Sequence, residues 1–207
     1  MRPETGNNSP SADNRKVSVR LDSGGHSFSA DNLPKMAFAQ DVQVEFTVVT
    51  HKTVLVPAEA FDPGAAAALL AVAGLPCSAD EEPLCITAGD KTAVAAIDRR
   101  CAAEIAHLFG GRAAFVSPLL HDCHAEERRL CIRTLGKVTF FTLTDNGRLR
   151  FAEAFRTENS DEVLYYTREL DRRCMLEGYL IYIYIYGDEA SETARLLKRY
   201  YKKVKCE

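Results

Sequence analysis

The fold class of this chain follows from one stretch, Tyr179-Leu-Ile-Tyr-Ile-Tyr-Ile-Tyr186. Successive side chains of a strand point to opposite faces of its sheet, so Ile181, Ile183 and Ile185 share one face and the intervening tyrosines share the other. Both faces of the strand are therefore apolar. A strand of this kind is typical of a sheet that other layers cover on both sides, which predicts an α/β protein.

Outward from this strand, the chain repeats one order of elements. In the second half we expect strands at residues 129–135, 138–144 and 148–155, a helix capped by Asn159 and Glu162, and a last helix capped by Asp188. In the first half we expect strands at residues 16–21, 26–30, 42–49, 53–56, 84–88, 92–97 and 113–116, a helix over 65–73, and a helix capped by Asp98. This order predicts two similar βββαβ-type halves with mixed sheets covered by helices, rather than a single Rossmann sheet.

The boundaries of these units follow from composition. Residues 1–15 are polar and contain no apolar run, so we expect a disordered leader rather than a secretory signal. The expected first half is 16–117, the expected linker is 118–128, and the expected second half is 129–207.

Charge and cysteine usage exclude several classes of protein. The chain carries 26 basic and 29 acidic side chains, so no large field of one sign is available to attract nucleic acid. No apolar stretch approaches the roughly 20 residues of a membrane helix. The seven cysteines form no CxxC pair, and most lie in apolar runs, which indicates reduced thiols in a reducing cytosol. We therefore expect a cytoplasmic protein that binds neither membrane nor nucleic acid.

Six short motifs in the two halves carry a resemblance. They are Lys16-Val-Ser-Val-Arg-Leu21, His26-Ser-Phe-Ser29, Thr53-Val-Leu-Val-Pro57, Arg148-Leu-Arg-Phe-Ala-Glu-Ala-Phe155, Asp161-Glu-Val-Leu-Tyr-Tyr166 and Tyr186-Gly187. Together they resemble an uncharacterised bacterial domain-of-unknown-function family, found in Bacteroidetes, whose members have an actin-like ATPase (ribonuclease H-like) fold. Because members tend to continue beyond the last helix, the resemblance implies that a terminal strand is absent here or contributed differently.

The resemblance also implies a place for ATP with Mg²⁺ between the halves. Actin-like ATPases hold the nucleotide with two glycine turns, each after a strand that ends in Asp, and with a third glycine turn at the adenine. Backbone N–H groups of such turns bind phosphate, and the carboxylates hold Mg²⁺ or its water shell. The segment with Asp22, Gly24 and Gly25 matches the first turn. The same residue types also form an ordinary hairpin turn between residues 16–21 and 26–30, and this interpretation is favoured.

The other two turns depart from the pattern. The turn at Gly136 contains no carboxylate, and Gly187 is followed by two acids, Asp188 and Glu189, which repel phosphate. We assign no catalytic residue and no metal ligand. The resulting hypothesis is a non-catalytic actin-like module that needs no cofactor and binds a protein partner. The alternative is an ATPase in which Asp22 coordinates hydrated Mg²⁺ while Gly24, Gly25, Gly136 and Gly187 line the phosphates and the base.

Two further segments have residue types found in binding sites. The histidines of His121-Asp-Cys-His124 could share a metal, but zinc needs three or four ligands and no second cluster supplies them, so a polar linker is favoured. The tail at residues 198–205 interleaves aromatic and basic side chains, as segments that contact RNA do. Cations at the end of a helix also stabilise its dipole, and this structural explanation is preferred to an RNA-contacting protein, the third hypothesis.

The hairpin at residues 138–155 is the surface that we expect a protein partner to contact. Phe140, Phe141, Phe151 and Phe155 concentrate aromatic area in its two strands. Alternation places Phe140 and Phe141 on opposite faces, so one of them is available for docking unless both faces are covered.

Overall fold

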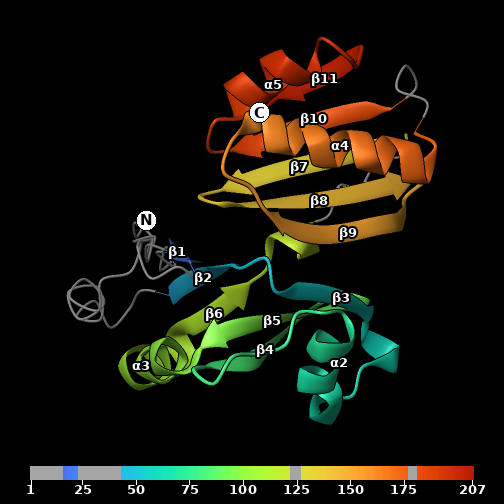
Figure 1. Cartoon of the computed structure of the whole chain (residues 1–207). Helices are drawn as coiled ribbons and strands as arrows, with labels where there is room; N and C mark the ends of the chain where they lie inside the picture. Colours follow the sequence, from blue (N-terminus) through green and yellow to red (C-terminus); the bar gives the residue numbers. More distant parts are fainter. Residues whose placement is uncertain (1–15, 23–42, 122–126, 177–180) are drawn as a thin grey trace, which may run out of the picture.

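The computed structural model describes residues 16–22, 43–121, 127–176 and 181–207. Figure 1 shows the first half, coloured blue to green, below the second half, coloured yellow to red. The predicted leader at residues 1–15, the strand at 26–30 and the hairpin turn with Gly24 and Gly25 lie outside the described residues.

The second half is built on one five-stranded mixed sheet in the order β11-β10-β7-β8-β9. Its strands are β7 (Arg129–Leu135), β8 (Val138–Asp145), β9 (Arg148–Arg156), β10 (Tyr182–Gly187) and β11 (Lys203–Cys206). The pairs β7–β8 and β8–β9 are antiparallel, whereas β10 runs parallel to both β7 and β11. The strand β11 corrects the expectation of an absent terminal strand.

Two helices, α4 (Ser160–Cys174) and α5 (Ala190–Leu197), pack on one face of this sheet. Ile183 and Ile185 of β10 lie on that face and are fully buried together with Leu197 and Tyr201 in the main core. The tyrosine face of β10 differs from the expected apolar layer: among the described residues, cationic side chains rather than a helix lie over its rings. Within residues 181–186, the isoleucines therefore form core, and the tyrosines form a cation-covered face.

The first half contains two smaller sheets. A parallel sheet has the order β1 (Lys16–Asp22), β2 (Gln43–Val49), β6 (Ala113–Val116), and an antiparallel sheet has the order β3 (Thr53–Pro57), β5 (Lys91–Asp98), β4 (Glu81–Ala88). The helix α2 (Ala66–Val72) packs on Val94 and Ala96 of β5, whereas α3 (Arg99–Phe109) belongs to the core on the other face of that strand. The neighbouring strands β2 and β3 thus belong to different sheets, which their residue patterns do not indicate.

Two of the three helix caps predicted from the sequence are present in the structure. The Asp98 carboxylate accepts from the Cys101 N–H at 2.9 Å, and the Asn159 side chain accepts from the Glu162 N–H at 3.0 Å, so both predicted caps are confirmed. The prediction for Asp188 is wrong. The residue before α5 is Glu189, at φ 55°, and it makes no capping hydrogen bond with its side chain.

The two halves meet in an apolar cluster of their own. It contains Val49, Leu119, Leu135, Val138 and Phe140, with Phe140 only 1% exposed. Strand β3 of the first half also lies beside β9 of the second, where Leu55 packs against the cluster. The segment predicted as a linker therefore begins inside a buried contact, because Leu119 is 2% exposed.

Most of the described cysteines are reduced, as the sequence predicts. Cys77, Cys85, Cys101, Cys174 and Cys206 are free thiols. Cys131 in β7 takes part in a disulfide, so the expectation of a reduced thiol is wrong at this position. None of the described helices has the length and apolar character needed to cross a membrane.

Candidate functional site

The structure brings three of the five predicted nucleotide-site residues together where the halves meet. Asp22 ends β1, Gly136 lies in the turn between β7 and β8, and Gly187 ends β10. A Cβ placed on Gly136 would lie 3.7 Å from Asp22 Oδ2, so the carboxylate of one half sits against the turn of the other. Gly24 and Gly25 lie outside the described residues, so their part in such a site stays a prediction.

Gly187 is required by the close approach of β10 to β7. Its φ is +91°, which favours glycine, and a Cβ at this position would lie 2.0 Å from the carbonyl oxygen of Thr134. The next residue continues this contact, because the Asp188 N–H donates to the same Thr134 oxygen at 2.8 Å. The glycine therefore lets the chain turn directly beside the β7–β8 turn.

Asp188 joins the two halves through one carboxylate oxygen. Its Oδ2 accepts from the Gly136 N–H at 2.8 Å and from Arg20 Nη1 of β1 at 2.6 Å. The hydrogen bond from Arg20, followed by the bond from Gly136, lowers the pKa of Asp188 against the opposing effect of burial. Sequence reasoning assigned Asp188 to a helix cap and did not single out Arg20. The adjacency of Asp188 to a glycine that ends a strand was the available signal.

This arrangement already supplies an anion to the turn that a phosphate would use. The Gly136 N–H is the kind of donor with which glycine turns hold phosphate oxygens. Here it donates to a carboxylate that Arg20 also binds. A phosphate at the same position would meet the negative charges of Asp22 and Asp188 and would have to displace the Asp188 carboxylate.

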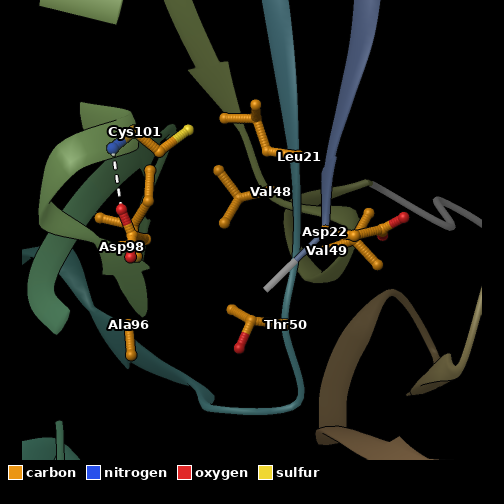
Figure 2. A pocket seen from close by; sticks show the side chains of 9 residues that line it. Leu21, Asp22, Val48, Val49, Thr50, Ala96, Asp98 and Cys101 are labelled. Carbon is orange, nitrogen blue, oxygen red and sulfur yellow. Dashed lines mark hydrogen bonds between the residues drawn. The ribbon is translucent and has the colours of Figure 1, made fainter. Parts of the chain in front are cut away.

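A small cavity lies at the ends of β1 and β2, beside the start of α3. Leu21, Asp22, Val48, Val49, Thr50, Ala96, Ile97, Asp98 and Cys101 line it. Figure 2 shows Asp22 and Asp98 on opposite sides of it, with Asp98 bonded to the Cys101 N–H. Its volume is about 40 Å³, whereas pockets for small organic ligands usually enclose about 300–1,000 Å³. The cavity therefore has room for water but not for a nucleotide.

The acid and the thiol at the cavity have structural roles. The Asp98 carboxylate caps α3, as described above. Burial is the main cause that raises the pKa of the Cys101 thiol, and the nearby Asp98 and Glu104 charges raise it further. A thiol with a raised pKa stays protonated at neutral pH, so the partly buried Cys101 does not have the lowered pKa of a reactive cysteine.

The other predicted segments are placed only in part. His121 ends a short turn after Leu120, whereas Cys123 and His124 lie outside the described residues, so the absence of zinc stays a prediction. The helix expected to carry the basic tail ends at Leu197. Lys203 and Lys205 instead belong to β11, so stabilisation of a helix dipole does not explain them.

In the hairpin predicted as a docking surface, β8 is core, whereas β9 is an edge strand whose residues are exposed or partly exposed. Phe140 and Phe141 are 1% and 0% exposed, because β8 packs against the first half on one face and against the main core on the other. Phe151 and Phe155 are partly buried and line a hollow of about 200 Å³ between β9 and α4. The Phe155 ring stacks on Tyr166 with 4.2 Å between ring centres. Two of the four predicted anchors are thus unavailable to a partner.

Neutralising Asp188 tests the contact between the halves. A group with a lowered pKa in the folded state stabilises that state above its ordinary pKa, and this stabilisation disappears as the pH falls through the lowered value. We expect Asp188→Asn to lower the free energy of unfolding at pH 7 by at most about 1 kcal/mol, because the ion pair is exposed to solvent. The difference between wild type and variant should persist to pH 5 and shrink below the ordinary Asp value of 3.8. Thermal melts from pH 7 to pH 3 measure it, and a difference that grows on acidification would contradict the assignment.

Three solved structures resemble this fold to different degrees. A protein of Bacteroides thetaiotaomicron with an actin-like ATPase fold and unknown function matches with a TM-score of 0.77 and 12% identity, over 95% of this chain and 91% of that one. The cytoplasmic domain of EpsL, an inner membrane component of the type II secretion system of Vibrio cholerae, matches with a TM-score of 0.48 and 14% identity, over 82% and 80%. A chain of the PilM–PilN type IV pilus biogenesis complex matches with a TM-score of 0.49 and 15% identity, over 88% and 76%.

The match to the Bacteroides thetaiotaomicron protein shows that this chain has the actin-like ATPase fold. A search of curated proteins finds no match. A family model described as "Protein of unknown function (DUF3822)" matches residues 28–204, which is most of the chain. On this match, the protein is a member of the family of unknown function DUF3822.

Proposed function

We propose that this protein is a non-catalytic module of actin-like fold that acts by binding a protein partner. The observation that carries the proposal is the pair of hydrogen bonds that the Asp188 carboxylate accepts. One comes from the Gly136 N–H of the same half, and the other comes from Arg20 of the opposite half. The donor that a bound phosphate would need is already used within the protein. The halves are thereby joined without a nucleotide.

The carboxylates near the contact between the halves do not have the arrangement that Mg²⁺ needs in an actin-like site. An actin-like site needs an acid in each half, since Mg²⁺ binds through carboxylates together with substrate phosphates. Asp22 supplies the first, but residues 133–136 of the second half contain none. Asp188 lies nearby, yet its contacting oxygen accepts two hydrogen bonds from the protein. With the Gly136 donor occupied and no carboxylate at residues 133–136, the fold would serve as a scaffold for surfaces that bind another protein.

Titration calorimetry with Mg·ATP tests the non-catalytic assignment. We expect no binding tighter than about 1 mM, equivalent to about −4.1 kcal/mol, because ATP must displace the Asp188 carboxylate. An Asp188→Ala variant should bind Mg·ATP more tightly than wild type, since it frees the Gly136 N–H and removes one negative charge.

The opposite outcome would support the ATPase alternative. Wild-type binding at or below about 1 μM, equivalent to about −8.2 kcal/mol, that is lost in Asp22→Ala would show that the turns hold nucleotide. An Asp161→Ala variant is the control for loss of one carboxylate, because Asp161 lies in the first turn of α4 and away from the contact between the halves.

A further inference from the structure

The tyrosine face of the second-half sheet carries an ordered set of cations. We call it the basic tyrosine face, formed by Arg129 and Arg133 of β7, Tyr182, Tyr184 and Tyr186 of β10, and Lys203 and Lys205 of β11. Arg129 Cζ lies 4.1 Å from the Tyr184 ring centre, and Lys203 Nζ lies 4.1 Å from that of Tyr182. Arg133 Cζ lies 4.9 Å from the Tyr186 ring centre. The cations thus flank one row of rings on both sides.

These cations exceed the carboxylates that pair with them. Among the described residues, one carboxylate forms an ion pair with the set, Glu127 Oε1 with Arg129 Nη2 at 2.8 Å. Arg133 is half buried over Tyr186, and burial lowers its pKa. Lys205 is exposed and donates to the Tyr184 hydroxyl at 3.3 Å. A second carboxylate, that of Glu207, hydrogen-bonds to Tyr186 at the end of this face. Four cations against Glu127 and Glu207 still leave net positive charge next to an edge of the sheet.

That edge is the outer side of β11. Within the described residues, β11 pairs with β10 and with no strand on its other side, and it lies at the end of the molecule away from the first half (Figure 1). In a parallel ladder, the N–H and C=O of one residue point to the same neighbour, and alternate residues point to opposite sides. Because the Glu207 N–H donates to the Ile185 carbonyl of β10 at 3.0 Å, the backbone groups of Val204 and Cys206 point outward.

We propose that β11 accepts an extended segment of a protein partner with Asp or Glu at alternate positions. This inference rests on the proposed function and names the chemistry of the partner. Alternate residues of a strand lie about 6.6–6.8 Å apart on one face, which matches the spacing of Lys203 and Lys205. Directly opposite side chains of paired strands approach to about 4.5–5.5 Å, so two carboxylates of the added strand would meet the two lysines. Val204 and Cys206 provide the backbone hydrogen bonds.

A peptide fits this surface better than a single-stranded nucleic acid does. Nucleic-acid platforms offer free aromatic faces on which bases stack. Here cations lie over the rings, and Tyr184 is 6% exposed. Lysines on an edge strand also discourage aggregation. That role accounts for Lys203 and Lys205 but not for Arg133, a half-buried cation that pairs with none of the described carboxylates.

Fluorescence anisotropy with short labelled peptides tests the proposal on the whole chain. The probe is an octapeptide of alternating Asp and Val. Its controls are an octapeptide with the four Asp residues in one block and one of alternating Lys and Val. We expect the alternating acidic peptide to bind at least about tenfold more tightly than either control, a difference of about 1.4 kcal/mol.

Two pairs of variants separate strand addition from simple charge attraction. Cys206→Pro removes one outward N–H and keeps the bonds to β10, and we expect it to weaken peptide binding at least about tenfold. Cys206→Ser keeps that N–H and should bind as the wild type does. Lys203→Glu/Lys205→Glu should abolish binding, whereas Arg172→Glu/Arg173→Glu, an equal charge change at exposed positions of α4, should not.

The proposal is overturned if no peptide binds, if Cys206→Pro binds as well as Cys206→Ser, or if a thymidine oligonucleotide binds more tightly than the acidic peptide. Circular dichroism melts confirm that each variant folds. Affinity capture from native lysate distinguishes a wrong assignment of β11 as the binding edge from a wrong assignment of the protein as a partner-binding module. Partners retained equally by all variants leave a partner-binding module whose contact lies elsewhere, whereas the lack of any specific partner contradicts the proposed function itself.

Discussion

Replacing Gly187 with alanine is expected to destabilise the protein by about 2–5 kcal/mol. A left-handed backbone costs a residue with a Cβ about 1–2 kcal/mol, and forcing packed atoms apart costs about 1–3 kcal/mol more. Both apply, because Gly187 has φ +91° and its Cβ would lie 2.0 Å from the Thr134 carbonyl oxygen. The obstacle is backbone on a central strand, so no side-chain rotation relieves it. For a chain of this size, the melting temperature should fall by roughly 4–20 °C.

Gly136→Ala is the matched control for this effect. Gly136 also has a positive φ, +56°, but the atoms nearest to its Cβ are those of the Asp22 carboxylate at 3.7–4.0 Å, an ordinary contact distance. Alanine at this position should therefore cost only the backbone term of about 1–2 kcal/mol. Equal melting temperatures for the two variants would contradict the close approach of β10 to β7.

Phe140→Ala is expected to cost about 3–5 kcal/mol, as is typical for a buried phenylalanine, and to reduce the cooperativity between the halves. Phe140 lies in the apolar cluster where the halves meet, whereas its neighbour Phe141 lies in the core of the second half. Truncating Phe140 removes contact between the halves. Phe141→Ala has a similar cost, but it weakens the second half itself.

Urea unfolding with two probes distinguishes these effects. The chain has no tryptophan, and its eight tyrosines all lie at or beyond residue 165, so tyrosine fluorescence reports on the second half. Far-ultraviolet circular dichroism reports on both halves. Unfolding curves from the two probes coincide when unfolding is cooperative. We expect coincidence in wild type and Phe141→Ala but separate curves for Phe140→Ala. Coincident curves for Phe140→Ala would show that the cluster does not couple the halves.

The contrast between Phe140 and Phe141 also explains why two of the four predicted docking residues are buried. Alternation correctly places the two rings on opposite faces of β8. It does not say what covers each face, because the covering groups come from the other half and from α4, far away in the sequence. The same limit explains why the basic tail was expected to end a helix although Lys203–Cys206 form the strand β11. Lysines in a tail carry no sign that their backbone pairs with a strand some twenty residues earlier.

Helix caps show where local sequence is sufficient and where it is not. Asp98 and Asn159 cap their helices as predicted, because a cap bonds backbone only a few residues away. Asp188 has an equally good local context for a cap, yet its carboxylate bonds Gly136 and Arg20, which are 52 and 168 residues away. A strong donor pair brought close by folding outcompetes a local bond that solvent can replace.

The residue pattern was sufficient to predict the α/β class, most strand and helix positions and the caps at Asp98 and Asn159. These depend on side-chain alternation, local hydrogen bonds and backbone sterics, all of which act over a few residues. The pattern could not show that β2 and β3 enter different sheets, that Phe140 joins the halves, that Asp188 occupies the Gly136 donor or that Gly187 lies against Thr134. Each of these results from contacts between distant segments, whose energies depend on which surfaces meet and which donors remain free after packing.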